Sequence, residues 1–176
     1  ASRGVAPRLP RSMLYEAVVL TAAALPVYRT YVRRADGDDP FALEATADDY
    51  RWIAEALGGA FGHGAADRFA LQFVADVMRG EWSAAPNVSE AARRAAVEFV
   101  LRFQQTSGPA TAKGVEDTAL YRWFPLASLC EVGGNPVRDL RDAPARLHAG
   151  SAIRLARYPR QLLAVETHDT KRSADV

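Results

Sequence analysis

RQLLAVETHDTKRSAD, residues 160–175, is the stretch that best indicates how this chain folds. Its apolar run, residues 162–165, gives way at once to charged and polar side chains. A short apolar run bounded in this way predicts a buried strand that ends in a charged cluster. Because α/β barrels carry their chemistry at the C-terminal ends of their strands, we expect Asp169 at a functional site, ionised near pH 7 beside its cationic neighbours. A solvated chain end is the alternative interpretation.

The composition is that of a globular domain with a sizeable core, since the chain has 176 residues, 49% of them hydrophobic and 24% charged. Twenty-two basic residues against twenty-one acidic ones give a net charge of +1, so neither nucleic acid nor a membrane is an expected partner. The single Cys130 excludes an internal disulfide and a cysteine zinc cluster, and it suits a reducing compartment. The apolar segment 13–25 contains Glu16 and is too short to span a bilayer. We therefore expect a cytoplasmic protein.

Apolar residues recur at helical spacing in the segments that precede residue 106. The first expected helix starts with Ser12 as its cap and ends at Pro26. The second starts at a capping box of Thr46 and Asp49 and stops at the glycines 58–59.

Two further helices are expected, over residues 65–79 and from Asn87, as cap, to Gln105. Together with the helix from residue 46 they predict a helical bundle. Between the first and second expected helices, residues 27–32 (VYRTYV) predict a strand or an extended loop.

Residues 104–121, QQTSGPATAKGVEDTALY, combine many polar groups with little apolar periodicity. Such a stretch predicts a loop of the kind that carries binding residues. Asp117 or Thr118 would then cap the helix that follows the loop. Further along, we expect a turn at residues 131–136 (EVGGNP) and one more helix at residues 144–156.

Four stretches of the chain resemble the C-terminal part of the catalytic domain of the maltooligosyl trehalose synthases, a branch of the α-amylase superfamily. They are PVYRTYV at 26–32, RFQQTSGPATAKGVEDTALYR at 102–122, SLCEVGGNP at 128–136 and THDTKRSADV at 167–176. The resemblance implies a mainly α chain, in which a helical insertion subdomain is joined to a few late strands of a (β/α)8 barrel, as an incomplete fragment of that barrel. The domains expected on this basis are a barrel-derived helix and strand or loop at 1–45, a helical subdomain at 46–108, and an active-site loop with helices and a late strand at 109–176.

The resemblance also implies an isomerase of trehalose biosynthesis, a glucan 1-alpha-D-glucosylmutase. Such an enzyme converts the reducing-end α-1,4 link of a maltooligosaccharide into an α,α-1,1 link, without a cofactor or metal. Asp169 takes the place of the residue that stabilises the transition state, and the nucleophile and acid/base belong to motifs absent from this chain. We therefore expect the N-terminal half of the catalytic domain as a missing partner and no activity from the chain alone. The substrate-binding residues expected are His168, Lys171, Arg172, Lys113, Glu116 and Asp117.

Two other classes of protein fit parts of the sequence. A metal-dependent phosphohydrolase with scattered His and Asp residues would use His63, His148 and the pair His168 and Asp169. A non-catalytic helical interaction module would use an apolar stripe such as the one at residues 52–57 as an association surface.

Overall fold

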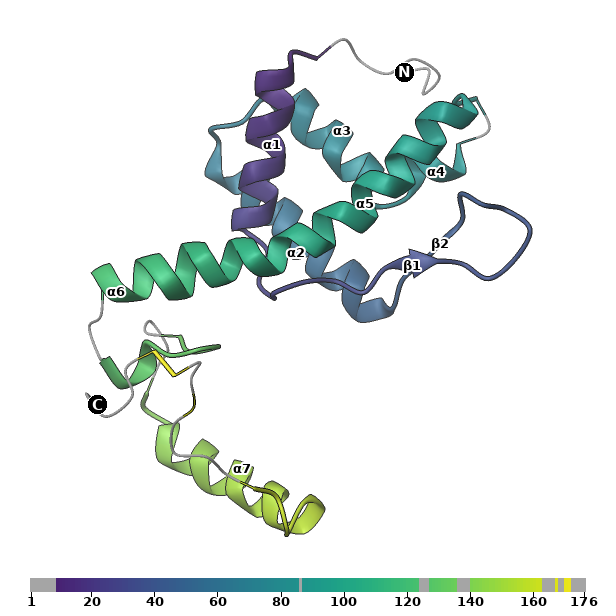
Figure 1. Ribbon diagram of the computed structural model, residues 1–176. Coiled ribbons are helices and arrows are strands. Elements are labelled where there is room, and N and C mark those ends of the chain that lie inside the picture. Colours follow the sequence, from purple (N-terminus) through teal and green to yellow (C-terminus); the bar gives the residue numbers. More distant parts are fainter. Residues whose placement is uncertain are drawn as a thin grey trace. The chain divides into compact units, whose positions relative to one another are not determined.

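The computed structural model describes residues 9–85, 87–123, 127–135, 140–162, 167, 170 and 171, and these residues are mainly helical (Figure 1). The expected predominance of helix is therefore confirmed. The chain divides into two compact units, residues 1–111 and residues 112–176. The first unit contains α1 (Arg11–Ala23), β1 (Arg33–Arg34), β2 (Leu43–Glu44), α2 (Ala47–His63), α3 (Arg68–Met78), α4 (Glu81–Ala84) and α5 (Glu90–Thr111).

The first unit is a helical bundle in which α1 packs against α2, α3 and α5. Its core takes fully buried side chains from every one of these helices, such as Ala17, Leu57, Leu71 and Val100. Burying apolar surface of this kind is the main stabilising contribution to such a fold. The segment before residue 46 therefore shares one core with the helices that follow it.

The apolar stripe at residues 52–57 belongs to this core. Ile53, Ala56 and Leu57 are at most 2% exposed, and Trp52 packs against them as a partly buried side chain. The stripe therefore supplies no association surface, and the interaction-module alternative loses the residues on which it was based.

The capping box predicted at the start of α2 is confirmed. The Thr46 hydroxyl accepts the Asp49 N–H at 3.1 Å, and the Asp49 carboxylate accepts the Thr46 N–H at 2.9 Å. Asp49 also accepts the N–H of Tyr31 at 2.8 Å. Burial raises the pKa of Asp49, but the hydrogen bonds from Tyr31 and Thr46 outweigh it and lower that pKa below its ordinary value. One buried carboxylate thus fixes the start of α2 and attaches residue 31 to it.

Two expected helix caps are wrong. Ser12 does not cap α1, which follows Pro10 without a side-chain cap. α5 begins at Glu90 with the Ser89 hydroxyl accepting the Ala92 N–H at 3.3 Å, so the cap lies two residues beyond Asn87.

The glycines 58–59 do not stop α2, which runs on to His63 and ends at Gly64 with a φ of 74°. Gly59 has a packing role instead, because a Cβ at this position would lie 2.9 Å from the Cβ of Ala24. Its missing side chain lets α2 approach the end of α1 closely.

The polar stretch 104–121 is helical, so the expected loop is wrong. α5 continues through Pro109 to Thr111 and is followed by a π-helix, η1 (Ala112–Ala119), and by α6 (Leu120–Arg122). Gln104 and Ser107 are buried, and their side chains hydrogen-bond to partners that are distant in the sequence. These buried hydrogen bonds require polar side chains at positions of the helix where apolar ones are usual. The sequence of the stretch therefore resembles that of a loop.

The partners of these buried side chains lie in the extended loop 29–32 and at Tyr28. Gln104 donates from Nε2 to the carbonyl of Val32 at 2.7 Å, and the Thr30 hydroxyl donates to Gln104 Oε1 at 3.2 Å. The Ser107 hydroxyl donates to the carbonyl of Tyr28 at 2.8 Å. Residues 27–32 are therefore an extended loop hydrogen-bonded to a helix. The strand that follows, β1, pairs with β2 in antiparallel fashion.

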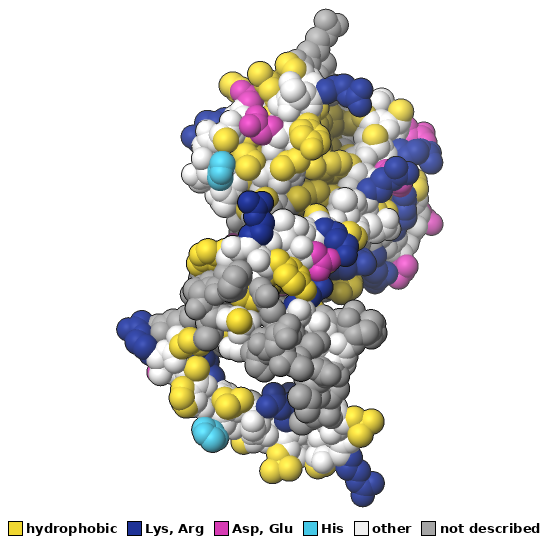
Figure 2. All heavy atoms as spheres, turned by 60° about the vertical axis from the view of Figure 1, so that its left-hand side comes forward, with side chains coloured by type: hydrophobic (Ala, Val, Ile, Leu, Met, Phe, Trp, Pro, Cys, Tyr) yellow, Lys and Arg dark blue, Asp and Glu magenta, His cyan; other side chains and the backbone are white. Residues whose placement is uncertain are grey.

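The second unit contains η1, α6, a 3-10 turn η2 (Ala127–Leu129) and α7 (Ala143–Arg157). α7 confirms the helix expected at 144–156, and it has no buried residue. Leu147, Ile153 and Leu155 are more than half exposed, and apolar side chains lie at the surface of this unit (Figure 2). The strand expected at 162–165 falls almost entirely outside the described residues, and its one described member, Leu162, is exposed.

Candidate functional site

The π-helix η1 places two charged residues of the AKGVEDT stretch against each other. Lys113 Nζ lies 2.5 Å from Asp117 Oδ2. The hydroxyl of Thr118 donates to the carbonyl of Lys113, five residues back, at 2.7 Å. π-helical turns are rare and often lie at functional sites. The side chains of η1 also contact residues outside this helix.

Asp117 also contacts the C-terminal segment of the chain. Lys171 Nζ lies 2.5 Å from Asp117 Oδ1, so the carboxylate lies between two ammonium groups. The hydrogen bond from Lys113, and after it the one from Lys171, lower the pKa of Asp117 to about 2. The same carboxylate raises the pKa of Lys171. Asp117 and Lys171 are therefore both charged at neutral pH.

The backbone of Lys171 is bound by two further side chains. Its N–H donates to Glu131 Oε1 at 2.6 Å, and its carbonyl accepts the hydroxyl of Tyr121 at 3.0 Å. Glu131 Oε1 also accepts the N–H of Val132 at 3.0 Å, which orients the carboxylate. Lys171 is thus held at its N–H, its carbonyl and its ammonium group.

The predicted turn at residues 131–136 is confirmed over its described part and is tied to η1 as well. Gly133 has a φ of 68°, a conformation that favours glycine, and its N–H donates to Glu116 Oε1 at 3.0 Å. Glu116 is only 6% exposed. Three segments therefore meet at one place: η1 with Tyr121, the turn at 131–133, and the C-terminal segment at Lys171. We call these the convergent cluster.

Four of the residues expected at the site lie in the convergent cluster, namely Lys113, Glu116, Asp117 and Lys171. His168, Asp169 and Arg172 lie outside the described residues. Their neighbours Thr167 and Thr170 bond to each other, because the Thr167 N–H donates to the Thr170 hydroxyl at 2.8 Å and the Thr170 N–H donates to the Thr167 carbonyl at 3.0 Å.

Tyr121 and Glu131 also belong to the cluster, although the sequence did not indicate them as site residues. Both lie within stretches that carry the family resemblance. Their side chains, however, form hydrogen bonds with backbone atoms of Lys171. A backbone N–H or carbonyl is the same at every residue, so no pattern of side-chain types indicates such a contact. The turn residues around Glu131 were the available signal, since they predict a fixed loop.

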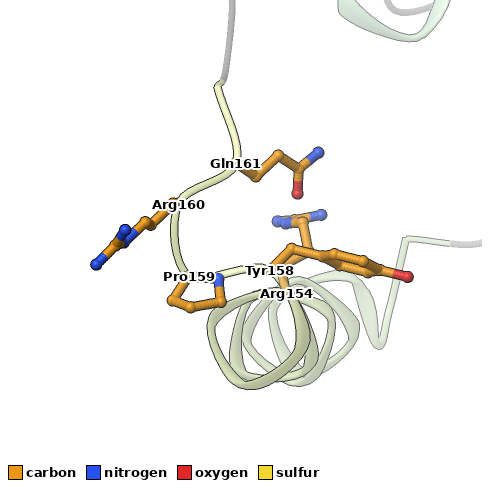
Figure 3. A pocket seen from close by; sticks show the side chains of 5 residues that line it. All are labelled: Arg154, Tyr158, Pro159, Arg160 and Gln161. Carbon is orange, nitrogen blue, oxygen red and sulfur yellow. The ribbon is translucent and has the colours of Figure 1, made fainter.

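A cavity of about 710 Å³ lies at the C-terminal end of α7, lined by Arg154, Tyr158, Pro159, Arg160 and Gln161. Figure 3 shows that Arg160 extends away from the other lining side chains. All five residues are exposed, and none of them belongs to the convergent cluster. This cavity is therefore a surface hollow to which none of the described residues expected to bind substrate contributes.

The described histidines do not support the metal-dependent alternative. His63 is the last residue of α2 and His148 lies on α7, and both are exposed. Among the residues that the structure describes, no group of three or more His, Cys, Asp and Glu side chains is arranged to hold a metal ion. Within the same residues, no helix combines the length and apolarity needed to cross a bilayer.

Comparison with known proteins supports the family resemblance. Over 79 residues the chain is 44% identical to a protein of Mycobacterium tuberculosis strain H37Rv named "Putative maltooligosyl trehalose synthase", and equally to the protein of that name in strain CDC 1551 / Oshkosh. The resemblance to maltooligosyl trehalose synthases is confirmed. The match covers 45% of this chain and 10% of each relative, so the chain spans about a tenth of the length of the curated relatives it matches. No family model matches the chain, and no solved structure does.

Proposed function

We propose that this chain is part of an intramolecular glucosyltransferase, which converts the reducing-end α-1,4 link of a maltooligosaccharide into an α,α-1,1 link. The observation that carries the proposal is the ion pair of Asp117 with Lys171. It joins the two longest stretches of family resemblance, 102–122 and 167–176, in one cluster. The 44% identity to the mycobacterial relatives supports the same assignment.

The reaction would need a retaining pair of carboxylates about 5 Å apart and stabilisation of an oxocarbenium-like transition state. Asp169 is the proposed stabiliser. An anion that binds the distorted, positively charged ring more tightly than the relaxed sugar lowers the barrier directly. The nucleophile and the acid/base would come from a part of the protein outside these 176 residues.

The convergent cluster would supply the acceptor side of the site. Isomerisation differs from hydrolysis because the released glucose must stay bound and attack the glycosyl-enzyme in place of water. Each ammonium group has three N–H donors, and Asp117 takes one from Lys113 and one from Lys171. The remaining donors are suited to the hydroxyls of a glucose unit.

The main effect of Asp117 would be to reduce the positive charge of the site. Two ammonium groups close to a cationic transition state would disfavour it by electrostatic repulsion. A carboxylate between them offsets that charge and fixes both lysines in place. Asp117 would therefore support the two lysines more than it contacts the sugar.

The proposal is tested with the full-length protein that contains this chain, assayed on maltopentaose. We expect reducing ends to disappear without an equal release of glucose, and we expect an anomeric NMR signal of the α,α-1,1 link. The Asp169→Asn variant should lose about a hundredfold or more of this activity. The isolated 176-residue chain should be inactive in the same assay. Asp169-dependent turnover by the isolated chain would contradict the assignment of the reacting carboxylates to another part of the protein.

A further inference from the structure

We propose that a pocket in the first unit, beside the β1–β2 hairpin, binds one glucose unit of an α-1,4-glucan as an accessory site. The choice of ligand rests on the proposed function, whereas the pocket itself is built from described residues of the first unit. None of these residues belongs to the convergent cluster. The site is therefore proposed in addition to the acceptor side of the reaction.

The floor of the pocket is apolar and belongs to the core of the unit. The cavity has a volume of about 260 Å³ and lies between the hairpin and the helices α2, α3 and α4. Val32, Ile53 and Met78 line it and are at most 5% exposed, and Leu43 packs against the same core. Because core packing holds these side chains, the floor is formed before any ligand binds. Small-molecule sites are typically concave, mostly apolar and preformed in this way.

Hydrogen-bonding side chains form the rim of the pocket. Asp39 comes from the loop that joins β1 to β2, Tyr50 from α2, Arg79 from the end of α3 and Ser83 from α4. The Ser83 hydroxyl donates to the carbonyl of Gly80 at 3.0 Å, so its oxygen is left as an acceptor. Asp39 and Arg79 supply a charged acceptor and charged donors, which form the stronger hydrogen bonds. Donors and acceptors therefore accompany one apolar surface.

Arg93 of α5 fixes two parts of this rim relative to each other. Its Nη2 lies 3.3 Å and 3.1 Å from the two carboxylate oxygens of Asp39, and its Nε donates to the carbonyl of Ser83 at 2.5 Å. Its guanidinium also lies 4.4 Å from the centroid of the Phe41 ring. The Phe41 N–H in turn donates to Asp39 Oδ1 at 2.9 Å. One side chain thus joins the hairpin loop to α4, and polar groups that are fixed beforehand lose little entropy when a ligand binds.

The lining suits a neutral ring that carries hydroxyls. A pyranose has faces of C–H groups, which can contact the apolar floor and the Tyr50 ring, and hydroxyls at its edge, which can bond to the rim. A wholly apolar ligand would cover the charges of Asp39 and Arg79 without giving them hydrogen bonds. A charged ligand of either sign would meet a like charge on one of these two residues. The volume lies just below the usual range of about 300 to 1,000 Å³, so it suits one sugar unit rather than a long glucan segment.

The site is tested by two-dimensional ¹⁵N NMR of the 176-residue chain titrated with maltose. We expect saturable shifts of the backbone amides of Leu43, Gly80 and Ala84, which line the pocket. Glucose should shift the same amides, because one ring fills the pocket. Ethylene glycol, which has hydroxyls but no ring, should give no saturable shift. Absence of saturation by maltose at these amides, or an equal response to ethylene glycol, would overturn the proposal.

Two variants test the aromatic ring and the polar rim. Tyr50→Ala should weaken maltose binding by about threefold to tenfold, because it removes the aromatic surface. Tyr15→Ala, at an exposed tyrosine of α1 that does not line the pocket, is the matched control and should bind like the wild type. Arg79→Met should weaken binding by about tenfold or more, because it removes the charged donors. Its control is Arg94→Met on α5, and unchanged affinity in both Tyr50→Ala and Arg79→Met would overturn the proposal.

The titration and the activity of the full-length protein separate this inference from the function on which its ligand rests. An inactive full-length protein, together with maltose bound at the pocket of the chain, would refute the proposed function and leave the site in place. An active full-length protein, together with a chain whose pocket amides do not respond to maltose, would refute the site alone. Maltose shifts confined to the convergent cluster would count as that second result.

Discussion

Asp117 and Lys171, 54 residues apart in the sequence, form an ion pair with 2.5 Å between Oδ1 and Nζ. Lys113 contacts the other oxygen of the same carboxylate. The side chains of Lys171 and Asp117 are 19% and 30% exposed, and because ion pairs that solvent still reaches are individually weak, the pair alone would not fix Lys171. The hydrogen bonds of Tyr121 and Glu131 to the backbone of Lys171 add the restraints that a single ion pair lacks.

Acid should break the Asp117 ion pairs only at very low pH. The pKa of Asp117 is lowered to about 2 from an ordinary 3.8, so the pairs stabilise the fold fully above 3.8, and that contribution is lost as the pH falls through about 2. Carboxyl carbon NMR should give a midpoint near 2 for this residue, and Lys171→Met should raise it. A wild-type midpoint at 3.8 or above would contradict the cluster.

The opposite dependence applies to the partner lysine. The pKa of Lys171 is raised above 10.5, so its contribution is present below 10.5 and is lost as the pH rises through the raised value. Neither group therefore titrates near neutral pH, and we expect the exchange protection of Lys171 to be constant between pH 5 and 8 after correction for intrinsic exchange. A step in protection within that range would require another titrating group in the cluster.

Gln104→Leu should destabilise the first unit by about 2 kcal/mol or more, because it leaves the buried carbonyl of Val32 and hydroxyl of Thr30 without their bonds to Gln104. Gln105→Leu is the matched control at the next residue, which is exposed, and should change the free energy of unfolding by less than about 0.5 kcal/mol. Urea denaturation of both variants measures the difference. Equal effects would contradict the buried polar contact between α5 and residues 29–32.

The adjacent glycines of α2 should respond in opposite directions to the same substitution. Gly58→Ala adds a Cβ with nothing within 4 Å and should stabilise the helix by about 0.5 to 1 kcal/mol. Gly59→Ala places a Cβ 2.9 Å from that of Ala24 and should destabilise the unit by about 1 kcal/mol or more. Thermal unfolding measures both. A stabilised Gly59→Ala variant would contradict the close approach of α2 to the end of α1.

Features that depend on contacts between residues close in the sequence were predicted correctly. The capping box of Thr46 and Asp49 was predicted because both partners lie within one turn of helix. The helix α7 was predicted because its boundaries follow from Pro144 and from the pattern after it. Each of these features depends on residues a few positions apart.

Where the partners are distant in sequence, the prediction was wrong. Gln104 and Ser107 resemble loop residues until the extended segment 28–32 supplies their buried partners, more than 70 residues away. Gly59 resembles a helix stop until Ala24 is placed beside it. The contacts of Tyr121 and Glu131 could not be predicted for a further reason, since their partners are backbone atoms of Lys171. Tertiary contacts outweighed local preference at each of these positions.

The role of the convergent cluster in holding the acceptor is tested most directly by the partition of maltopentaose between isomerisation and hydrolysis in the full-length protein. If the lysines retain the released glucose, Lys171→Met should raise the fraction of turnovers that release free glucose by about tenfold. Arg94→Met, which removes an exposed ion pair with Glu90 on α5, should leave that fraction at the wild-type value. A Lys171→Met enzyme with the wild-type partition would contradict the assignment of the cluster to the acceptor side.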